Sequence, residues 1–150
     1  MGGVGCGGAL IAPDVALFAA HCGDWKDEQI NIGAYKLETL IEGAQERFCD
    51  EWIPDPKYGT EGSDINYDFA LCRLNKPVTI DTSIVTLELN EEDSVPAAGE
   101  NLDVMGLGAL SQGGSAPEYL HEVTVPAIDN DVCNRRDYYD GEITDIMLCA

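Results

Sequence analysis

The sequence predicts an all-β domain built from many short strands, arranged as a sandwich or a barrel. Short apolar runs recur along the 150 residues, turn residues separate them, and helical periodicity is scarce. The clearest element is a hairpin, because apolar runs at Ala9–Ala12 and Val15–Ala20 flank a Pro13-Asp14 turn. Many short strands joined by glycine-rich turns are typical of sandwiches and barrels.

The segments expected to form strands are short apolar or alternating runs bounded by turn residues. They are Ala9–Ala12, Val15–Ala19, Gln29–Ile32, Glu46–Ile53, Phe69–Leu74, Leu102–Met105, Tyr119–Val125 and Ile143–Cys149. Phe69-Ala70-Leu71-Cys72 is apolar at every position, which favours a strand covered on both faces within a closed sheet.

One short helix is expected from Asp129 or Asn130 towards Tyr138, since aspartate and asparagine cap helix N-termini well. Residues 75–100 form the best candidate connector between two halves of the chain. This segment carries two prolines and an acidic cluster at Glu91-Glu92-Asp93.

The strong acidity excludes whole classes of partner. Lysine and arginine total 8 against 28 aspartate and glutamate residues, a formal net charge of −20. Nucleic-acid binding requires basic residues that neutralise phosphates, and anionic membrane surfaces attract basic segments, so we expect neither partner. The charge favours solubility, including in a salty medium where salt screens the repulsion; a surface made for a basic partner is the open alternative.

The six cysteines form an even set at positions 6, 22, 49, 72, 133 and 149. None lies in a C-x-x-C pair, which argues against a zinc site or a thioredoxin-like motif. The wide spacing of the cysteines favours a disulfide framework, and therefore an oxidising compartment. The N-terminus nevertheless lacks a basic residue and a long apolar stretch, and so does not resemble a secretory signal. We therefore expect that the N-terminal part of the protein is missing from this chain.

A histidine lies where the hairpin ends. His21 directly precedes Cys22, and a disulfide from Cys6 could staple the hairpin beside it. Reactive groups are often presented on such rigidly held loops. Taken by itself, the residue is better explained as a structural histidine beside a disulfide.

Several segments resemble, in order, the chymotrypsin/trypsin-like serine proteases, the S1 peptidases. Cys6–Cys22 is similar to the family's C-G-G-x-L-I…A-A-H-C segment, and Tyr67–Leu74 (YDFALCRL) to its D-I-A-L-L-x-L segment. Met105–Gly108 followed by Gly113-Gly114, Leu120–Cys133 (LHEVTVPAIDNDVC) and Ile146–Ala150 (IMLCA) resemble later family segments. These matches cover nearly the whole chain, and their shared order makes the resemblance specific.

The resemblance implies a trypsin-like double β-barrel with a nearly complete first barrel and a partial second barrel. Residues 1–150 would form a single partial peptidase domain. About 1–90 would belong to the first barrel and about 101–150 to the second.

The resemblance also implies catalytic roles. His21 matches the general base that activates a serine hydroxyl, and Asp68 matches the carboxylate that orients this histidine. Asp50, Asp55 and Asp64 lie nearby, but Asp68 alone stands immediately before an apolar strand, where a partly buried carboxylate needs a partner. A plain strand-edge or turn aspartate is the alternative.

The nucleophile is absent from these residues. The serines of the chain, none of which lies in a Gly-Asp-Ser-Gly-Gly setting, are Ser63, Ser83, Ser94, Ser111 and Ser115. We expect a fragment of a serine endopeptidase that is inactive as it stands, because its oxyanion hole is missing with its serine. The alternatives are a non-catalytic protease homologue, acting as a secreted binding or regulatory module, and an acidic secreted β-domain of unrelated function.

The same resemblance implies disulfides Cys6–Cys22 and Cys133–Cys149, each contributing about 3 kcal/mol. Cys49 and Cys72 remain as a plausible cross-strand pair or as two buried thiols. Phe18 stands where the family usually has serine or threonine. Some members bind calcium in an acidic loop where this chain has Glu38, Glu42 and Glu46, but Ala34 replaces a first ligand, so we expect no metal.

We therefore expect a secreted, extracellular hydrolase domain that is monomeric and needs no cofactor. Its partner would be a protein or peptide substrate. Cleavage specificity is out of reach, because the specificity segment would follow Ala150.

Overall fold

The computed structural model describes residues 5–36, 43–60 and 66–150. It divides into two compact units. The first comprises Met1–Leu89 with Gly106–His121, and the second comprises Asn90–Met105 with Glu122–Ala150.

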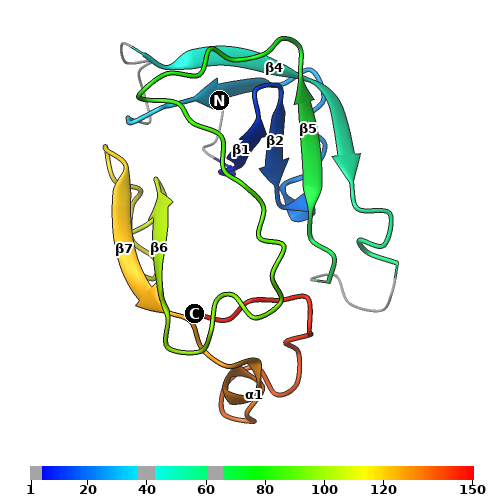
Figure 1. Ribbon diagram of the computed structural model, residues 1–150, viewed down its shortest axis with the longest axis vertical. Helices are drawn as coiled ribbons and strands as arrows, with labels where there is room; N and C mark the ends of the chain where they lie inside the picture. The colour runs from blue at the N-terminus through cyan, green and yellow to red at the C-terminus, as the bar shows by residue number, and fades with distance from the viewer. Residues whose placement is uncertain (1–4, 37–42, 61–65) are drawn as a thin grey trace. The chain divides into compact units, whose positions relative to one another are not determined.

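A strongly curled five-stranded antiparallel sheet dominates the first unit (Figure 1). Its strands are β1 (Ala9–Ala12), β2 (Val15–Phe18), β3 (Gln29–Ile32), β4 (Gln45–Pro54) and β5 (Ala70–Leu74). Their order in the sheet is β1-β2-β5-β4-β3, so β5 is the central strand. The expected hairpin is present as β1 and β2, joined at Pro13-Asp14.

The core of this unit comes from alternating residues of the strands. In β5 the side chains of Ala70, Cys72 and Leu74 are buried while Arg73 points to solvent. Val78 and Ile84, from the segment after β5, join the same core cluster. The buried side chains of β5 therefore share one face of the sheet, as expected for period-two burial.

A buried arginine attaches the segment after β5 to β4. Arg47 donates hydrogen bonds to the carbonyl oxygens of Glu46, Lys76 and Pro77 and to the side chain of Gln45. A buried charge requires such complete hydrogen bonding, so this side chain holds the start of the connector in place.

The second unit contains β6 (Asn101–Gly106), β7 (His121–Pro126) and the short helix α1 (Asn130–Cys133). Within the described part of the chain, strands β6 and β7 pair only with each other. The helix begins after Asp129, whose side chain accepts a hydrogen bond from the Asp131 N–H. It is shorter than the helix expected as far as Tyr138.

The prediction of a strand at Ile143–Cys149 is wrong. This segment contributes only an isolated bridge between Ile128 and Cys149. In the rest of the segment, side-chain amides take the place of strand-to-strand hydrogen bonds. Asn130 donates to the carbonyl oxygens of Thr144 and Met147, and Asn134 exchanges two hydrogen bonds with Ile143. Side-chain partners thus satisfy backbone groups that a neighbouring strand would otherwise pair.

Among the described residues, no helix has the length and apolar character needed to cross a membrane.

Candidate active site

Two strands of the central sheet converge on the candidate site. Phe18, the last residue of β2, pairs with Ala70, the first residue of β5. Because the strands are antiparallel, the chain leaving β2 and the chain entering β5 lie at the same end of the sheet. Residues shortly after Phe18 and shortly before Ala70 are therefore brought together, and these include His21 and Asp68.

A single 3₁₀ turn presents His21. The turn spans Ala20–Cys22, and a disulfide joins its last residue to Cys6. Gly23 follows with φ of 86°, a backbone conformation that suits glycine. The Trp25 indole N–H donates to the carbonyl oxygen of Cys22 at 3.0 Å, so the turn is held on both sides.

Asp68 enters from a tight turn before β5. Tyr67 has φ of 56°, which is uncommon for a residue with a side chain, and the Phe69 N–H donates to the Tyr67 carbonyl oxygen. The Phe69 carbonyl oxygen in turn accepts from the Asp55 N–H at 2.8 Å. These contacts direct the Asp68 carboxylate back towards the 3₁₀ turn.

Both carboxylate oxygens of Asp68 are bonded to His21. One oxygen lies 2.6 Å from the imidazole Nδ1, and the other accepts from the His21 backbone N–H at 2.7 Å. An ionised carboxylate can only accept, so Nδ1 carries the proton and Nε2 keeps a free lone pair. The imidazole is 63% exposed and Asp68 is 25% exposed. The arrangement therefore presents an oriented, accessible imidazole that can take up a proton at Nε2.

Burial is the largest single influence on the pKa of the Asp68 carboxyl, and it raises that pKa. The hydrogen bonds and charge attraction from His21, with help from the Ala20 backbone, outweigh it and lower the pKa of Asp68 below its usual range. The carboxyl is therefore ionised at neutral pH, as an orienting acceptor must be.

The neighbouring acids have other partners. Asp50 lies 3.6 Å from the Arg73 guanidinium, and Asp55 accepts from the Lys57 backbone N–H at 2.8 Å. Asp64 lies outside the described residues. Of the acids considered from the sequence, Asp68 is the one that the structure brings to His21.

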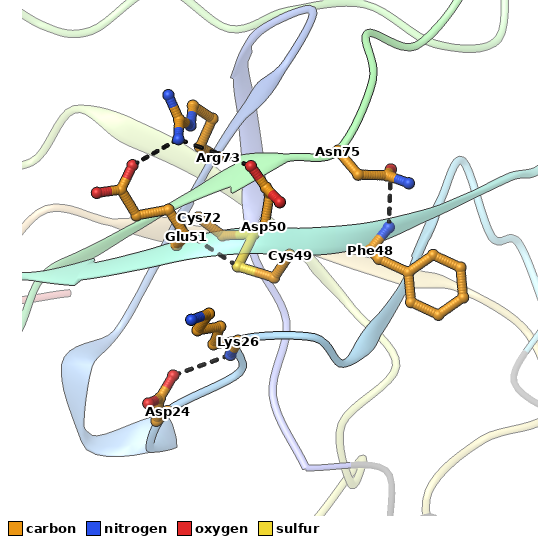
Figure 2. Close-up of a disulfide and its surroundings, with 9 residues drawn as sticks. All are labelled: Asp24, Lys26, Phe48, Cys49, Asp50, Glu51, Cys72, Arg73 and Asn75. Carbon is orange, nitrogen blue, oxygen red and sulfur yellow. Dashed lines mark hydrogen bonds and ion pairs between the residues drawn. A yellow bond between two sulfur atoms is a disulfide. The ribbon is translucent and has the colours of Figure 1, made fainter.

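The structure contains three disulfides, which join the same pairs that the resemblance implied or left open. They are Cys6–Cys22, Cys49–Cys72 and Cys133–Cys149. Cys49 and Cys72 are fully buried and link β4 to β5, beneath the exposed ion pairs of Arg73 with Asp50 and Glu51 (Figure 2).

One group of described residues has the spacing of a metal site, namely Cys6, His21 and Cys22. Because the two sulfurs are joined in a disulfide, neither is a thiolate that could bind a metal. Of the acids considered for calcium, Glu46 accepts from the Gln29 side chain at 2.8 Å, whereas Glu38 and Glu42 lie outside the described residues.

Comparison with known families decides the identity of the fold. The family model described as Trypsin matches residues 1–150, the whole chain. The chain belongs to the trypsin family. Members of this family are serine endopeptidases, hydrolases that act on protein substrates.

Individual relatives agree with this family. Over 153 residues the chain is 35% identical to "Serine proteinase stubble" of Drosophila melanogaster, covering 97% of the chain and 19% of that protein. It is 30% identical to "Trypsin" of Simulium vittatum, with 97% and 58% covered, and 25% identical to human "Chymotrypsin-like elastase family member 1", with 97% and 57% covered.

The fold agrees with a solved structure as well. The structure described as "Structure of GrC" superposes with a TM-score of 0.77 at 27% identity, covering 86% of this chain and 56% of that one. The all-β, trypsin-like fold class predicted from the sequence is confirmed. The chain spans about half the length of most of these relatives, and less of the first.

Phe18 packs against two tryptophan rings in this trypsin-family chain. The phenyl ring is buried and lies 6.3 Å from the Trp25 ring and 5.7 Å from the Trp52 ring, between centroids. Gly8 makes room for it, because a Cβ there would lie 2.7 Å from the Phe18 ring and 2.8 Å from the Leu17 carbonyl oxygen. Sequence reasoning missed this contact, although the Gly7-Gly8 pair is a visible signal of close approach.

Proposed function

We propose that His21 and Asp68 are the general base and its orienting carboxylate in a serine endopeptidase. The observation that carries this proposal is the double hydrogen bonding of Asp68 to His21, whose imidazole is 63% exposed. This is the arrangement that proton removal from an attacking hydroxyl requires. Family membership supports the same assignment.

The proposal assigns the nucleophile to a segment outside these 150 residues. No serine of the chain has the Gly-Asp-Ser-Gly-Gly setting. The 150 residues alone are therefore expected not to hydrolyse peptides, since a base without nucleophile or oxyanion hole has nothing to activate. In this proposal they form one partial peptidase domain, with about 1–90 in the first barrel and about 101–150 in the second.

We further propose a secreted, monomeric protein that acts on protein or peptide substrates. Three disulfides support an oxidising, extracellular location. The net charge of −20 supports the absence of nucleic-acid partners.

The test uses the full-length protein from which this chain derives, treated with a fluorophosphonate probe that labels activated serines. We expect labelling and peptide hydrolysis, both reduced about 10⁴-fold by His21→Ala and by Asp68→Asn. His121→Ala, which changes the other histidine, is the matched control and should leave both rates unchanged.

The same experiment distinguishes an active protease from the main alternative, a non-catalytic homologue. A glycine in place of the serine in the segment after Ala150, with no labelling, would identify a non-catalytic homologue. Labelling that is unaffected by His21→Ala would refute the assignment of the base.

A further inference from the structure

The Cys49–Cys72 disulfide crosses an irregularity between β4 and β5. Cys49 pairs with Leu74, whereas Glu51 pairs with Arg73, so β4 has one extra residue at Asp50. Beyond this bulge, Cys72 pairs with Trp52. The disulfide therefore runs diagonally and ties one side of the bulge on β4 to the other side on β5.

A bulge is a weak point for strand register. It interrupts the ladder locally, and a slip of one residue would move every side chain of the strand to the opposite face. Cys72 is buried in the middle of β5, and Asp68 lies in the turn just before that strand. A covalent link at Cys72 thus fixes where along the sheet Asp68 is presented.

The other end of the disulfide supports the chain that follows His21. The Cys49 carbonyl oxygen accepts from the Asp27 N–H at 2.7 Å, and the Cys49 N–H donates to the Glu28 carbonyl oxygen at 3.0 Å. The Glu28 N–H donates to the Trp25 carbonyl oxygen at 2.9 Å. Figure 2 shows this loop beside Cys49, where the Lys26 N–H is held by Asp24.

These contacts close a ring. It runs from His21 through Cys22 to the Trp25 indole, through Glu28 to Cys49, across the disulfide to Cys72, and along β5 to Asp68. The hydrogen bonds from Asp68 to His21 complete it. The disulfide is the only covalent step in the ring that joins different strands.

We propose that the Cys49–Cys72 disulfide is a positioning element that sets the His21–Asp68 geometry. This inference rests on the proposed function in that it concerns the same two residues, His21 and Asp68. The role of the disulfide is an additional claim, which the proposed function does not require. The disulfide touches neither residue directly. It acts by holding β5 and the loop after His21 in one register against β4.

The test compares Cys49→Ala/Cys72→Ala with two controls in the same 150-residue chain. Cys133→Ala/Cys149→Ala removes a disulfide of the other unit, and Ile84→Ala destabilises the same core at a residue that is not a member of the ring. NMR of histidine-labelled protein follows the Nδ1 proton of His21, and His121 is an internal reference because the chain has two histidines. Carboxyl NMR follows the titration of Asp68.

In the Cys49→Ala/Cys72→Ala variant we expect at least about tenfold faster exchange of the His21 Nδ1 proton with water, since its hydrogen bond opens more often. The pKa of Asp68 should move back up towards the ordinary aspartate value. Both controls, measured at temperatures where they are folded, should retain the native exchange rate and titration.

Unchanged exchange and titration in a folded Cys49→Ala/Cys72→Ala variant would overturn the proposal. If that variant does not fold, Cys49→Ala/Cys72→Val, which refills the space left by the sulfur atoms, takes its place. If neither variant folds, the disulfide is required for folding itself, and the proposal that it positions His21 and Asp68 is overturned as well. These readouts need no catalysis. An absence of serine labelling in the full-length protein would therefore refute the proposed function and leave this inference standing.

Discussion

The proposed role of Asp68 depends on its hydrogen-bond partners as well as on its position in the sequence. Both of its oxygens are bonded to one residue, through the imidazole and through the backbone N–H of His21. The backbone contact fixes the carboxylate even when the imidazole moves. A side chain held twice in this way has a narrow range of rotamers, which is what orientation of a base requires.

This residue makes acid stability testable. The folded pKa of Asp68 lies below its unfolded value of about 3.9, so the unfolded state binds more protons between the two values. The stabilisation is complete above about pH 4 and is lost as the pH falls through the lower folded pKa. Asp68→Asn should reduce the free energy of unfolding by about 1–3 kcal/mol at pH 7. Urea unfolding across this pH range should show the difference from the native chain shrinking in acid; a pH-independent difference would contradict the assignment.

Gly8 offers a second test at a single residue. Gly8→Ala places a methyl group against the Leu17 carbonyl oxygen and the Phe18 ring, and the backbone oxygen has little freedom to move. Overpacking of this kind costs about 1–3 kcal/mol, which thermal unfolding would detect. Gly7→Ala is the matched control, because nothing lies within 4 Å of a Cβ there. Equal effects of the two substitutions would refute the steric explanation.

Among the elements, β5 carries the largest share of the organisation of the site. It pairs with β2 on one side and with β4 on the other, and its alternate residues are buried. A central strand cannot shift without breaking two ladders. Its first residues are thereby fixed against the end of β2, where His21 follows.

The segment after α1 depends on asparagine side chains instead of strand pairing. Asn130 and Asn134 together satisfy backbone groups of Ile143, Thr144 and Met147. Asn130→Ala/Asn134→Ala should increase amide hydrogen exchange at Ile143, whose N–H donates to the Asn134 side chain, by about tenfold. Asn31→Ala on β3, in the other unit, is the control and should leave this rate unchanged. Retained protection in the double variant would mean that other contacts hold the segment.

At the scale of the molecule, the two units differ in how much they bury. Among the described residues of the first unit, nine buried residues form a core cluster. In the described part of the second unit the buried apolar residues are Ala127, Cys133 and Cys149. A two-stranded sheet with so little buried surface is marginal by itself, so its disulfide supplies a larger share of its stability.

The net charge of −20 also acts on the whole molecule. Self-repulsion between like charges destabilises a compact state, and salt screens it over about 10 Å at 0.1 M. Raising NaCl from about 0.01 M to about 0.5 M should therefore raise Tm by several degrees. Calorimetry with NaCl and NaBr at equal ionic strength should give similar increases. A Tm that stays constant or falls would show that charge repulsion contributes little.

Much of the architecture follows from local sequence. The Pro13-Asp14 turn between two apolar runs sufficed for the first hairpin, and Gln29–Ile32 forms a strand with the expected bounds. The expected strand at Ile143–Cys149 does not form, and the side chains of Asn130 and Asn134 satisfy backbone groups there instead. Apolar composition, on which the prediction depended, cannot reveal such partners. Such partners are set by chain segments that meet only after folding.

Motifs with the right residues in the right order determined the trypsin family, the hairpin and the identity of the candidate pair, because these depend on residue type and sequence order. Tertiary structure alone decided that Asp68 is bonded to His21 through both of its carboxylate oxygens, while Asp50 and Asp55 have other partners. It also decided that Gly8 lies against Phe18. The physical reason is common to these cases: each contact joins residues that lie in or beside different strands, and only the register of the folded sheet sets the distance between them.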